Sequence, residues 1–138
     1  MTTPGRDRRG LLDTSALIDF RADRLAAEVT DVAVSAVSIA ELSFGVTATA
    51  DPVVGLQRRQ RLDAILDEFD VLAFDMEVAE YYGALASLVR AAGRNPRPRR
   101  MDLQIAATAA RHGLVLCTLD AADFAGLESA VEIIDLDA

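Results

Sequence analysis

The chain has 138 residues, of which 51% are hydrophobic and 26% are charged, values ordinary for one globular domain with a single core. Acidic residues outnumber basic ones by 22 to 14, and the net charge of −8 argues against a protein that coats nucleic acid through general positive charge. A nuclease is still allowed, because metal ions can neutralise an acidic pocket. No apolar run approaches the ~18 residues of a membrane span and no signal-peptide pattern opens the chain, so we expect a cytoplasmic protein without a membrane segment.

Missing residue types narrow the chemistry further. All 14 basic residues are arginine, which removes the lysine of a phosphate-binding P-loop and any Schiff-base chemistry. One histidine, His112, and one cysteine, Cys117, are too few for a zinc site built from several such ligands. Cys117 lies in an apolar run, where a buried and inert thiol is the usual state. Any chemistry therefore has to rest on carboxylates.

The first strand and helix meet at an acid. Residues 1–9 are polar and predict a flexible N-terminal extension to a single domain that spans residues 1–138. A strand is expected over Arg9–Asp13, followed by a short helix over Ser15–Arg21. Asp13, between them, suits a helix cap, and it also faces the edge of a parallel sheet at which ligands collect.

A second acid follows the second strand. The apolar run in Asp31–Ser35 predicts a buried strand, and the helical pattern begins shortly after it. Ser38 and Glu41 have the spacing of a capping box, in which the glutamate would bond to the start of its own helix. On the residues alone, this structural interpretation and a functional role for Glu41 are equally open.

Two helices and a third strand occupy the middle of the chain. A helix is expected over Val53–Glu68 after Pro52, with a core face formed by Leu62, Ile65, Leu66 and Phe69. A strand over Asp70–Phe74 leads to a helix over Met76–Ala92, closed by Gly93. The core face of this second helix is expected to carry Val78, Tyr82, Leu85, Ala86 and Val89.

A loop rich in arginine leads to a third acid. Residues Arg94–Arg100 contain two prolines and four arginines, which predict a surface loop free of helix. A helix is expected over Asp102–His112, closed by Gly113. Asp102 shares a face with apolar residues such as Ile105, so we expect it to point inward, where a charge needs a partner.

The last part of the chain repeats the pattern of strand and acid. A fourth strand is expected over Leu114–Thr118, followed by Asp120 and Asp123, each of which has an ordinary explanation as a turn residue. A fifth strand is expected over Val131–Ile134. Strands that alternate with helices through one chain predict an α/β fold with a parallel sheet covered on both faces.

Taken together, the acids predict a metal site. Five are expected to meet at one edge of the sheet: Asp13, Glu41, Asp102, Asp120 and Asp123. So many like charges repel one another unless cations lie between them, and oxygen ligands favour Mg²⁺ or Mn²⁺, which suit phosphodiester hydrolysis. The hydroxyls of Thr14, Ser15 and Thr118 are expected to orient these carboxylates. The arginine loop is expected to hold the phosphates of a strand through Arg97, Arg99 and Arg100.

Four stretches resemble the PIN domain and, more narrowly, VapC-type toxins of bacterial toxin–antitoxin pairs: Leu12–Ser15, Ser38–Leu42 with Gly45, Asp102–Ala107, and Thr118–Asp120 with Asp123 and Phe124. The resemblance covers nearly the whole chain. It implies a PIN-like three-layer α/β/α fold with a five-stranded parallel sheet of order 3-2-1-4-5. It also implies an endoribonuclease that needs Mg²⁺ or Mn²⁺ and cleaves single-stranded or loop RNA, a homodimer, and inhibition by a VapB-type antitoxin with a basic C-terminal tail.

Carried over to this chain, the metal-binding and catalytic acids of the family match Asp13, Glu41, Asp102 and Asp120, with Asp123 as a further ligand or a supporting acid. Many relatives carry asparagine where Asp120 stands, so the division of roles between Asp120 and Asp123 is open. Phosphorelay receivers and aspartyl-phosphate phosphatases share such acids, but they require a lysine that this chain lacks. A catalytically silent acidic module that binds a basic partner is the alternative to a nuclease.

Overall fold

A five-stranded parallel sheet forms the centre of the molecule. The computed structural model describes residues 8–138, so residues 1–7 of the expected extension lie outside the described residues. The strands are β1 Arg9–Leu12, β2 Asp31–Ser35, β3 Asp70–Leu72, β4 Val115–Thr118 and β5 Ile133–Asp135. They lie in the order β3-β2-β1-β4-β5, and every neighbouring pair is parallel. The predicted sheet and its strand order are confirmed.

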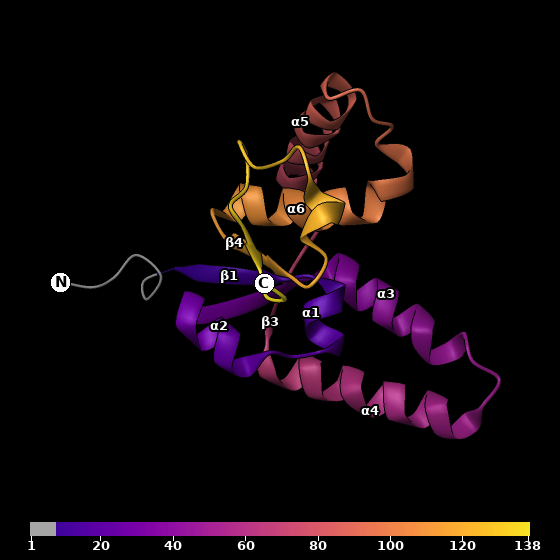
Figure 1. Ribbon diagram of the computed structural model, residues 1–138. Helices are drawn as coiled ribbons and strands as arrows, with labels where there is room; N and C mark the ends of the chain where they lie inside the picture. Colours follow the sequence, from indigo (N-terminus) through magenta and orange to yellow (C-terminus); the bar gives the residue numbers. More distant parts are fainter. Residues whose placement is uncertain (1–7) are drawn as a thin grey trace.

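Helices cover both faces of this sheet (Figure 1). They are α1 Thr14–Ile18, α2 Ala22–Glu28, α3 Ala36–Thr47, α4 Pro52–Glu68, α5 Met76–Ala91 and α6 Arg100–His112, with 3-10 turns η2 Arg97–Arg99 and η3 Ala121–Phe124. In Figure 1, α5 and α6 lie above the sheet, and α1, α2 and α4 lie below it. The arrangement is the predicted three-layer α/β/α fold. Within residues 8–138, no helix is both long enough and apolar enough to cross a membrane.

Successive residues of β1 enter separate apolar cores on the two faces of the sheet. Leu11 packs in a cluster that includes Leu85 of α5 and Ile105 of α6. Leu12 packs in a second cluster with residues such as Leu25 of α2 and Ile65 of α4. Such alternation is expected of a strand buried on both faces. Because both faces hold β1 in register, the position of the acid that follows it is well defined.

Gly10 lies where β1 approaches its neighbours most closely. A Cβ atom at Gly10 would lie 3.0 Å from Sγ of Cys117 and 3.3 Å from Cγ1 of Val29. We expect Gly10→Ala to lower the free energy of unfolding by about 1–3 kcal/mol, because both crowded groups are packed in the core. Gly83→Ala, in α5 with nothing within 4 Å, is the control and should stabilise the protein by about 0.5–1 kcal/mol. Urea unfolding measures both, and equal stabilities would contradict the close packing at β1.

Two differences from the prediction concern the helices below the sheet. The helix expected over Ser15–Arg21 ends at Ile18, and a separate helix, α2, follows it. The only residue of α2 that is buried is Leu25, so the sequence of α2 shows no apolar stripe. Leu66, predicted on the core face of α4, is 46% exposed, because α4 is buried only along the narrow line of Leu62 and Ile65.

Three further differences concern the ends of elements. The arginine loop was expected to be free of helix, but Arg97–Arg99 forms a 3-10 turn that leads into α6, which begins at Arg100. Proline is tolerated in this first turn, because an N–H group has no partner there in any case. β3 ends at Leu72 rather than at Phe74, and β5 begins at Ile133, since Val131 instead bonds back to the carbonyl of Leu127.

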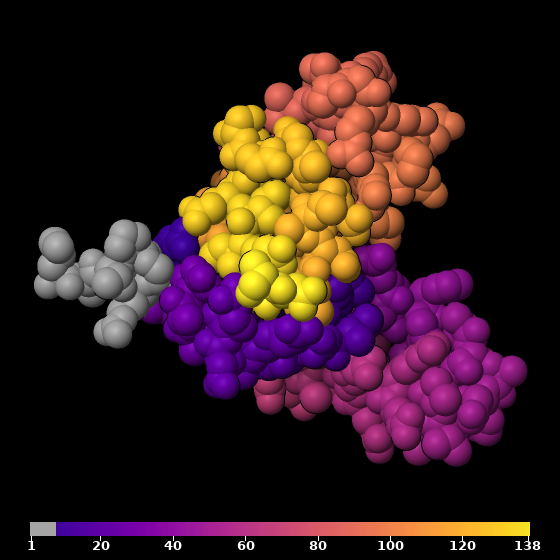
Figure 2. Space-filling model, in the orientation of Figure 1, coloured from indigo at the N-terminus to yellow at the C-terminus, as the bar shows by residue number. Residues whose placement is uncertain are grey.

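α3 and α4 form an antiparallel arm that projects from the rest of the molecule (Figures 1 and 2). Its exposed apolar residues include Phe44, 73% exposed, and Leu56, 58% exposed. Figure 2 shows a recess between this arm and the segment that connects α5 to α6. The arm and this segment therefore form the two walls of the recess.

Candidate active site

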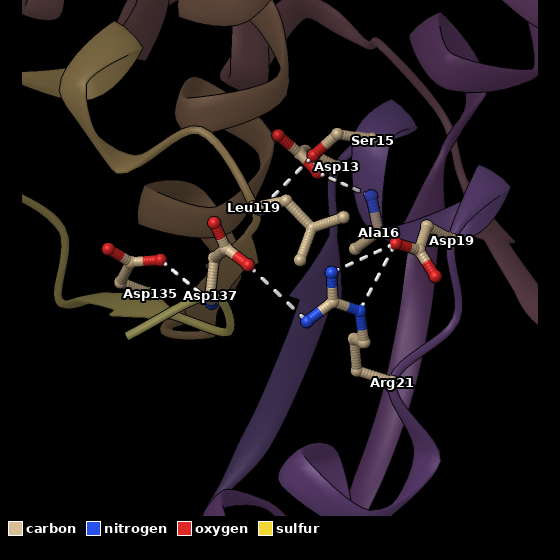
Figure 3. Close-up of polar contacts among 8 residues, drawn as sticks. All are labelled: Asp13, Ser15, Ala16, Asp19, Arg21, Leu119, Asp135 and Asp137. Carbon is tan, nitrogen blue, oxygen red and sulfur yellow. Dashed lines mark hydrogen bonds and ion pairs between the residues drawn. The ribbon is translucent and has the colours of Figure 1, made fainter.

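Asp13 follows β1 directly, and it is both a helix cap and a buried acid. The residue is only 5% exposed. Its Oδ1 atom accepts hydrogen bonds from the backbone N–H of Ala16 at 3.0 Å and from the hydroxyl of Ser15 at 2.7 Å (Figure 3). The capping role predicted for Asp13 is therefore real. It does not explain the second carboxylate oxygen, which points away from the helix backbone.

That second oxygen ties the end of β1 to the end of β4. Oδ2 of Asp13 accepts a 2.5 Å hydrogen bond from the hydroxyl of Thr118. The hydroxyl of Ser15 accepts one from the backbone N–H of Leu119 at 3.1 Å, which Figure 3 shows. Burial raises the pKa of Asp13 above its ordinary value. The hydrogen bonds from Thr118, Ser15 and Ala16 oppose this rise, while repulsion from Asp120 adds to it.

Glu41 does not belong to a capping box, and that interpretation is wrong. β2 ends at Ser35, and Ser35 rather than Ser38 caps α3. The hydroxyl of Ser35 accepts a hydrogen bond from the backbone N–H of Val37 at 3.0 Å. Glu41 lies in the second turn of α3. Its Oε1 atom accepts a 2.6 Å hydrogen bond from the hydroxyl of Thr14 in α1. The side chain of Glu41 is thereby held against the helix that follows Asp13.

Ser38 contacts Thr14, which the capping-box interpretation of Ser38 did not predict. It is fully buried, and its hydroxyl lies 3.2 Å from that of Thr14. The signal was present in the sequence, because Ser38 precedes Glu41 by three residues and so shares its helix face. Ser38 and Glu41 together position Thr14 from the α3 side.

Asp102 lies in the first turn of α6, half-buried beside the other acids. Burial raises its pKa to about 6, repulsion from Asp123, Glu41 and Asp13 adds to the rise, and the positive charge of Arg99 opposes it. These acids come from four separate parts of the chain. The charges of Asp13, Glu41 and Asp123 all act on Asp102, and we call these four residues the acid neighbourhood.

Arg99 supplies positive charge to this neighbourhood. Its guanidinium group donates a hydrogen bond to Asp123 and lies 3.8 Å from Oδ2 of Asp102. Arg99 is thus the partner that an inward-pointing Asp102 requires.

Asp120 is exposed at the start of η3, and its side chain makes no capping bond. The backbone N–H of Asp120 donates a hydrogen bond to the hydroxyl of Thr118 at 2.9 Å.

Arg97 and Arg100 lie apart from the acids. They line a cavity of about 700 Å³ on the side of α5, together with Arg90 and Tyr82. Of the three arginines predicted to contact phosphate, the structure therefore brings only Arg99 to the acids. Arg90 and Tyr82 were not singled out in the sequence, because both fit the pattern of an ordinary amphipathic helix.

The acids suit a divalent cation by their chemistry. Within residues 8–138, no three acidic, histidine or cysteine side chains lie close enough together, as they stand, to surround one ion. The donors are nevertheless carboxylate and hydroxyl oxygens, the ligands that Mg²⁺ and Mn²⁺ prefer. Raised pKa values at Asp13 and Asp102 indicate negative charge that a cation would stabilise. After its three hydrogen bonds, the Asp13 carboxylate keeps a lone pair for a ligand.

The hydrogen bond from Thr118 to Asp13 can be tested by removing the hydroxyl alone. We expect Thr118→Val to lower the free energy of unfolding at neutral pH by about 1–3 kcal/mol, because a buried carboxylate oxygen loses its donor. Thr108→Val is the control: Thr108 is equally buried, but its hydroxyl bonds only to the carbonyl of Gln104 in its own helix. Thr108→Val should lower the free energy of unfolding by less than about 1 kcal/mol. Urea unfolding compares the two, and equal losses would show that Asp13 does not depend on Thr118.

The sequence was compared with families and with curated proteins. Residues 10–128 match the family model described as PIN domain. The chain is 38% identical over 135 residues to Ribonuclease VapC5 of Mycobacterium tuberculosis (strain ATCC 25618 / H37Rv), covering 96% of this chain and 95% of VapC5. It is 34% identical over 134 residues to Ribonuclease VapC4 of the same organism, covering 94% and 98% of the two chains.

The fold was compared with solved structures. It is similar to the crystal structure of VapBC-5 from Mycobacterium tuberculosis, a member of the VapBC family of toxin-antitoxin systems. The TM-score is 0.79 at 34% sequence identity, over 93% of this chain and 97% of that chain. The family match, over residues 10–128, spans the four stretches of sequence in which the acids lie. The chain therefore belongs to the PIN-domain family, in its VapC-type branch.

Proposed function

We propose that this chain is the toxin of a VapBC-type pair, an endoribonuclease that depends on Mg²⁺ or Mn²⁺ and hydrolyses phosphodiester bonds of single-stranded or loop RNA. The predicted ribonuclease class is confirmed by two relatives named as ribonucleases that match nearly the whole chain. Metal dependence rests on one observation. Burial, with added repulsion from the neighbouring carboxylates, raises the pKa of Asp102 to about 6, and a bound cation would stabilise the ionised form.

The roles come from the resemblance to the family, and contacts at Asp13, Glu41 and Asp102 support them. In this proposal, the metal ligands and catalytic acids are Asp13, Glu41, Asp102 and Asp120, with Asp123 as a further ligand, and the orienting hydroxyls are Thr14, Ser15 and Thr118. When bound, the metal supplies an activated water and stabilises the leaving oxygen. Hydrogen bonds hold Asp13 and Glu41 in place before substrate arrives. In the same proposal Arg99, which lies beside Asp102, contacts a phosphate that flanks the scissile bond.

The proposed partner is a VapB-type antitoxin with a basic C-terminal tail, bound in the cytoplasm. Support comes from the solved relative, which is a VapBC system, and from the net charge of −8. Asp102 and Asp123 already accept one guanidinium group, that of Arg99, so an arginine of the tail would meet suitable acceptors. A homodimer, which the family implies, completes the proposal.

A cleavage assay on the purified chain, freed of any antitoxin, tests the activity. We expect cleavage of structured RNAs with Mg²⁺ or Mn²⁺ and none with EDTA. Full cleavage in EDTA would contradict the metal dependence. Silence with both metals across transfer RNA, ribosomal loops and messenger fragments would favour the alternative, an acidic module that binds a basic partner without catalysis.

A further inference from the structure

Within residues 8–138, four exposed arginines without an ion pair lie at one corner of the molecule, whereas Arg24, Arg58 and Arg61, which also lack one, lie in α2 and α4. In the part of the chain that the structure describes, Arg90, Arg94, Arg97 and Arg100 make no salt bridge, although acids are in excess. All four are exposed, and they lie between the end of α5 and the start of α6. Arg99, within the same segment, is the exception, because it turns toward Asp102 and Asp123. The segment therefore presents unneutralised positive charge to solvent.

Three of these arginines share the cavity between α5 and the connection to α6. We call it the basic cavity; it has a volume of about 700 Å³ and is lined chiefly by Tyr82, Ala86, Arg90, Asn95, Arg97 and Arg100. The elements that carry these residues, α5, the connection and the start of α6, lie in the upper right of Figure 1. The half-buried ring of Tyr82 packs against the core, so the cavity has a rigid aromatic wall. The cavity thus combines guanidinium donors with a flat apolar surface.

We propose that the basic cavity binds a nucleotide of the RNA strand outside the scissile bond, its phosphate on the arginines and its base against Tyr82. The inference rests on the proposed function. Guanidinium groups bind phosphate oxygens through paired N–H groups, and aromatic rings stack on bases of any sequence. Three guanidinium groups without an acidic partner around one cavity favour an anion as its ligand.

The position of the cavity indicates which part of the strand it holds. Arg100 and Asp102 are two residues apart in α6 and therefore lie on nearly opposite faces of the helix, whereas Arg99, in the 3-10 turn before it, lies on the side of Asp102. A strand held at Asp102 must therefore pass around the start of α6 before it reaches the basic cavity. The basic cavity is thus a second binding site away from the scissile bond, which we call the distal grip. It contributes to binding only when the RNA is long enough to reach both Asp102 and the cavity.

Binding measured by fluorescence anisotropy in EDTA, where cleavage is not expected, tests this grip. The probes are labelled single-stranded RNAs of about four and about twelve nucleotides. Arg90→Gln should weaken binding of the longer RNA about fivefold or more and reduce the slope of log affinity against log salt by about 0.7, the loss of one phosphate contact. Tyr82→Leu should weaken the same RNA about fivefold without changing that slope, because a stacked base releases no counterion. The shorter RNA should bind both variants like the wild type.

Arg59→Gln is the matched control, an exposed arginine in α4 that pairs with Asp63 and lies outside the cavity. It removes the same charge and should change neither binding nor slope. Arg90→Gln and Arg59→Gln behaving alike at both lengths would overturn the proposal, and so would dependence on Arg90 for an acidic peptide but not for RNA. RNA cleavage that ignores Arg90 at every length would overturn the distal grip and leave the proposed nuclease intact. RNA binding that needs Arg90, with no cleavage under any metal, would support the grip and contradict the nuclease.

Discussion

Asp102→Asn should reduce RNA cleavage by about 10³-fold or more and leave the protein folded. The carboxylate carries the charge that the proposed metal needs, and the amide does not. At neutral pH, burial and the neighbouring acids disfavour the ionised form of Asp102, whose pKa is raised to about 6. The amide removes this cost, so we expect the free energy of unfolding to rise by about 1 kcal/mol, a figure reduced for the solvent screening of a side chain that is 32% exposed. A gain in stability with a loss of cleavage is the result expected if Asp102 takes part in the proposed reaction.

Asp63→Asn is the control for this substitution. Asp63 is an exposed acid of α4 that pairs with Arg59 of the same helix and is not one of the acids around Asp102. Its replacement should leave both cleavage and thermal stability nearly unchanged. Cleavage by Asp102→Asn within tenfold of the wild-type rate would show that Asp102 does not take part in the reaction.

The sheet and the positions of the acids along it could be predicted, because both depend on local pattern. Apolar runs locate the strands, and an acid that follows such a run lies at the ligand-binding edge wherever the strands are parallel. Asp13 shows this most clearly, since the run before it is buried on both sides. The strand order came from the resemblance to a family and could not come from the residues alone.

The environment of each acid could not be predicted, because it depends on where neighbouring elements end. Ser38 and Glu41 have perfect capping-box spacing, yet β2 ends at Ser35 and that residue takes the cap. The direction of each arginine between α5 and α6 likewise depends on the 3-10 turn at Arg97–Arg99. After this turn, Arg99 lies beside the acids, whereas Arg97 and Arg100 lie beside α5. The number of charges in the loop does not predict this difference.

The stability of the metal-free protein should fall as the pH rises from about 4 to about 7. In the folded state, Asp102 has a pKa of about 6, above its ordinary value of 3.8, so in this range the folded protein holds a proton that the unfolded chain has lost. The stabilisation that Asp102 contributes is therefore complete below its ordinary pKa of 3.8. It is lost as the pH rises through the pKa of about 6 that Asp102 has in the folded protein. The raised pKa of Asp13 acts in the same direction.

Divalent metal should reverse this trend, because Mg²⁺ and Mn²⁺ bind the deprotonated carboxylates. Mn²⁺ at about a hundred times its dissociation constant should raise the free energy of unfolding by about 2.7 kcal/mol near neutral pH and by much less near pH 5. Thermal unfolding in EDTA and in Mn²⁺ at these two pH values measures the effect without any RNA. Asp102→Asn should lose most of the pH dependence and most of the metal effect, whereas Asp63→Asn should keep both. Equal stabilisation by Mn²⁺ in wild type and Asp102→Asn would place the metal elsewhere and separate the acid neighbourhood from the proposed chemistry.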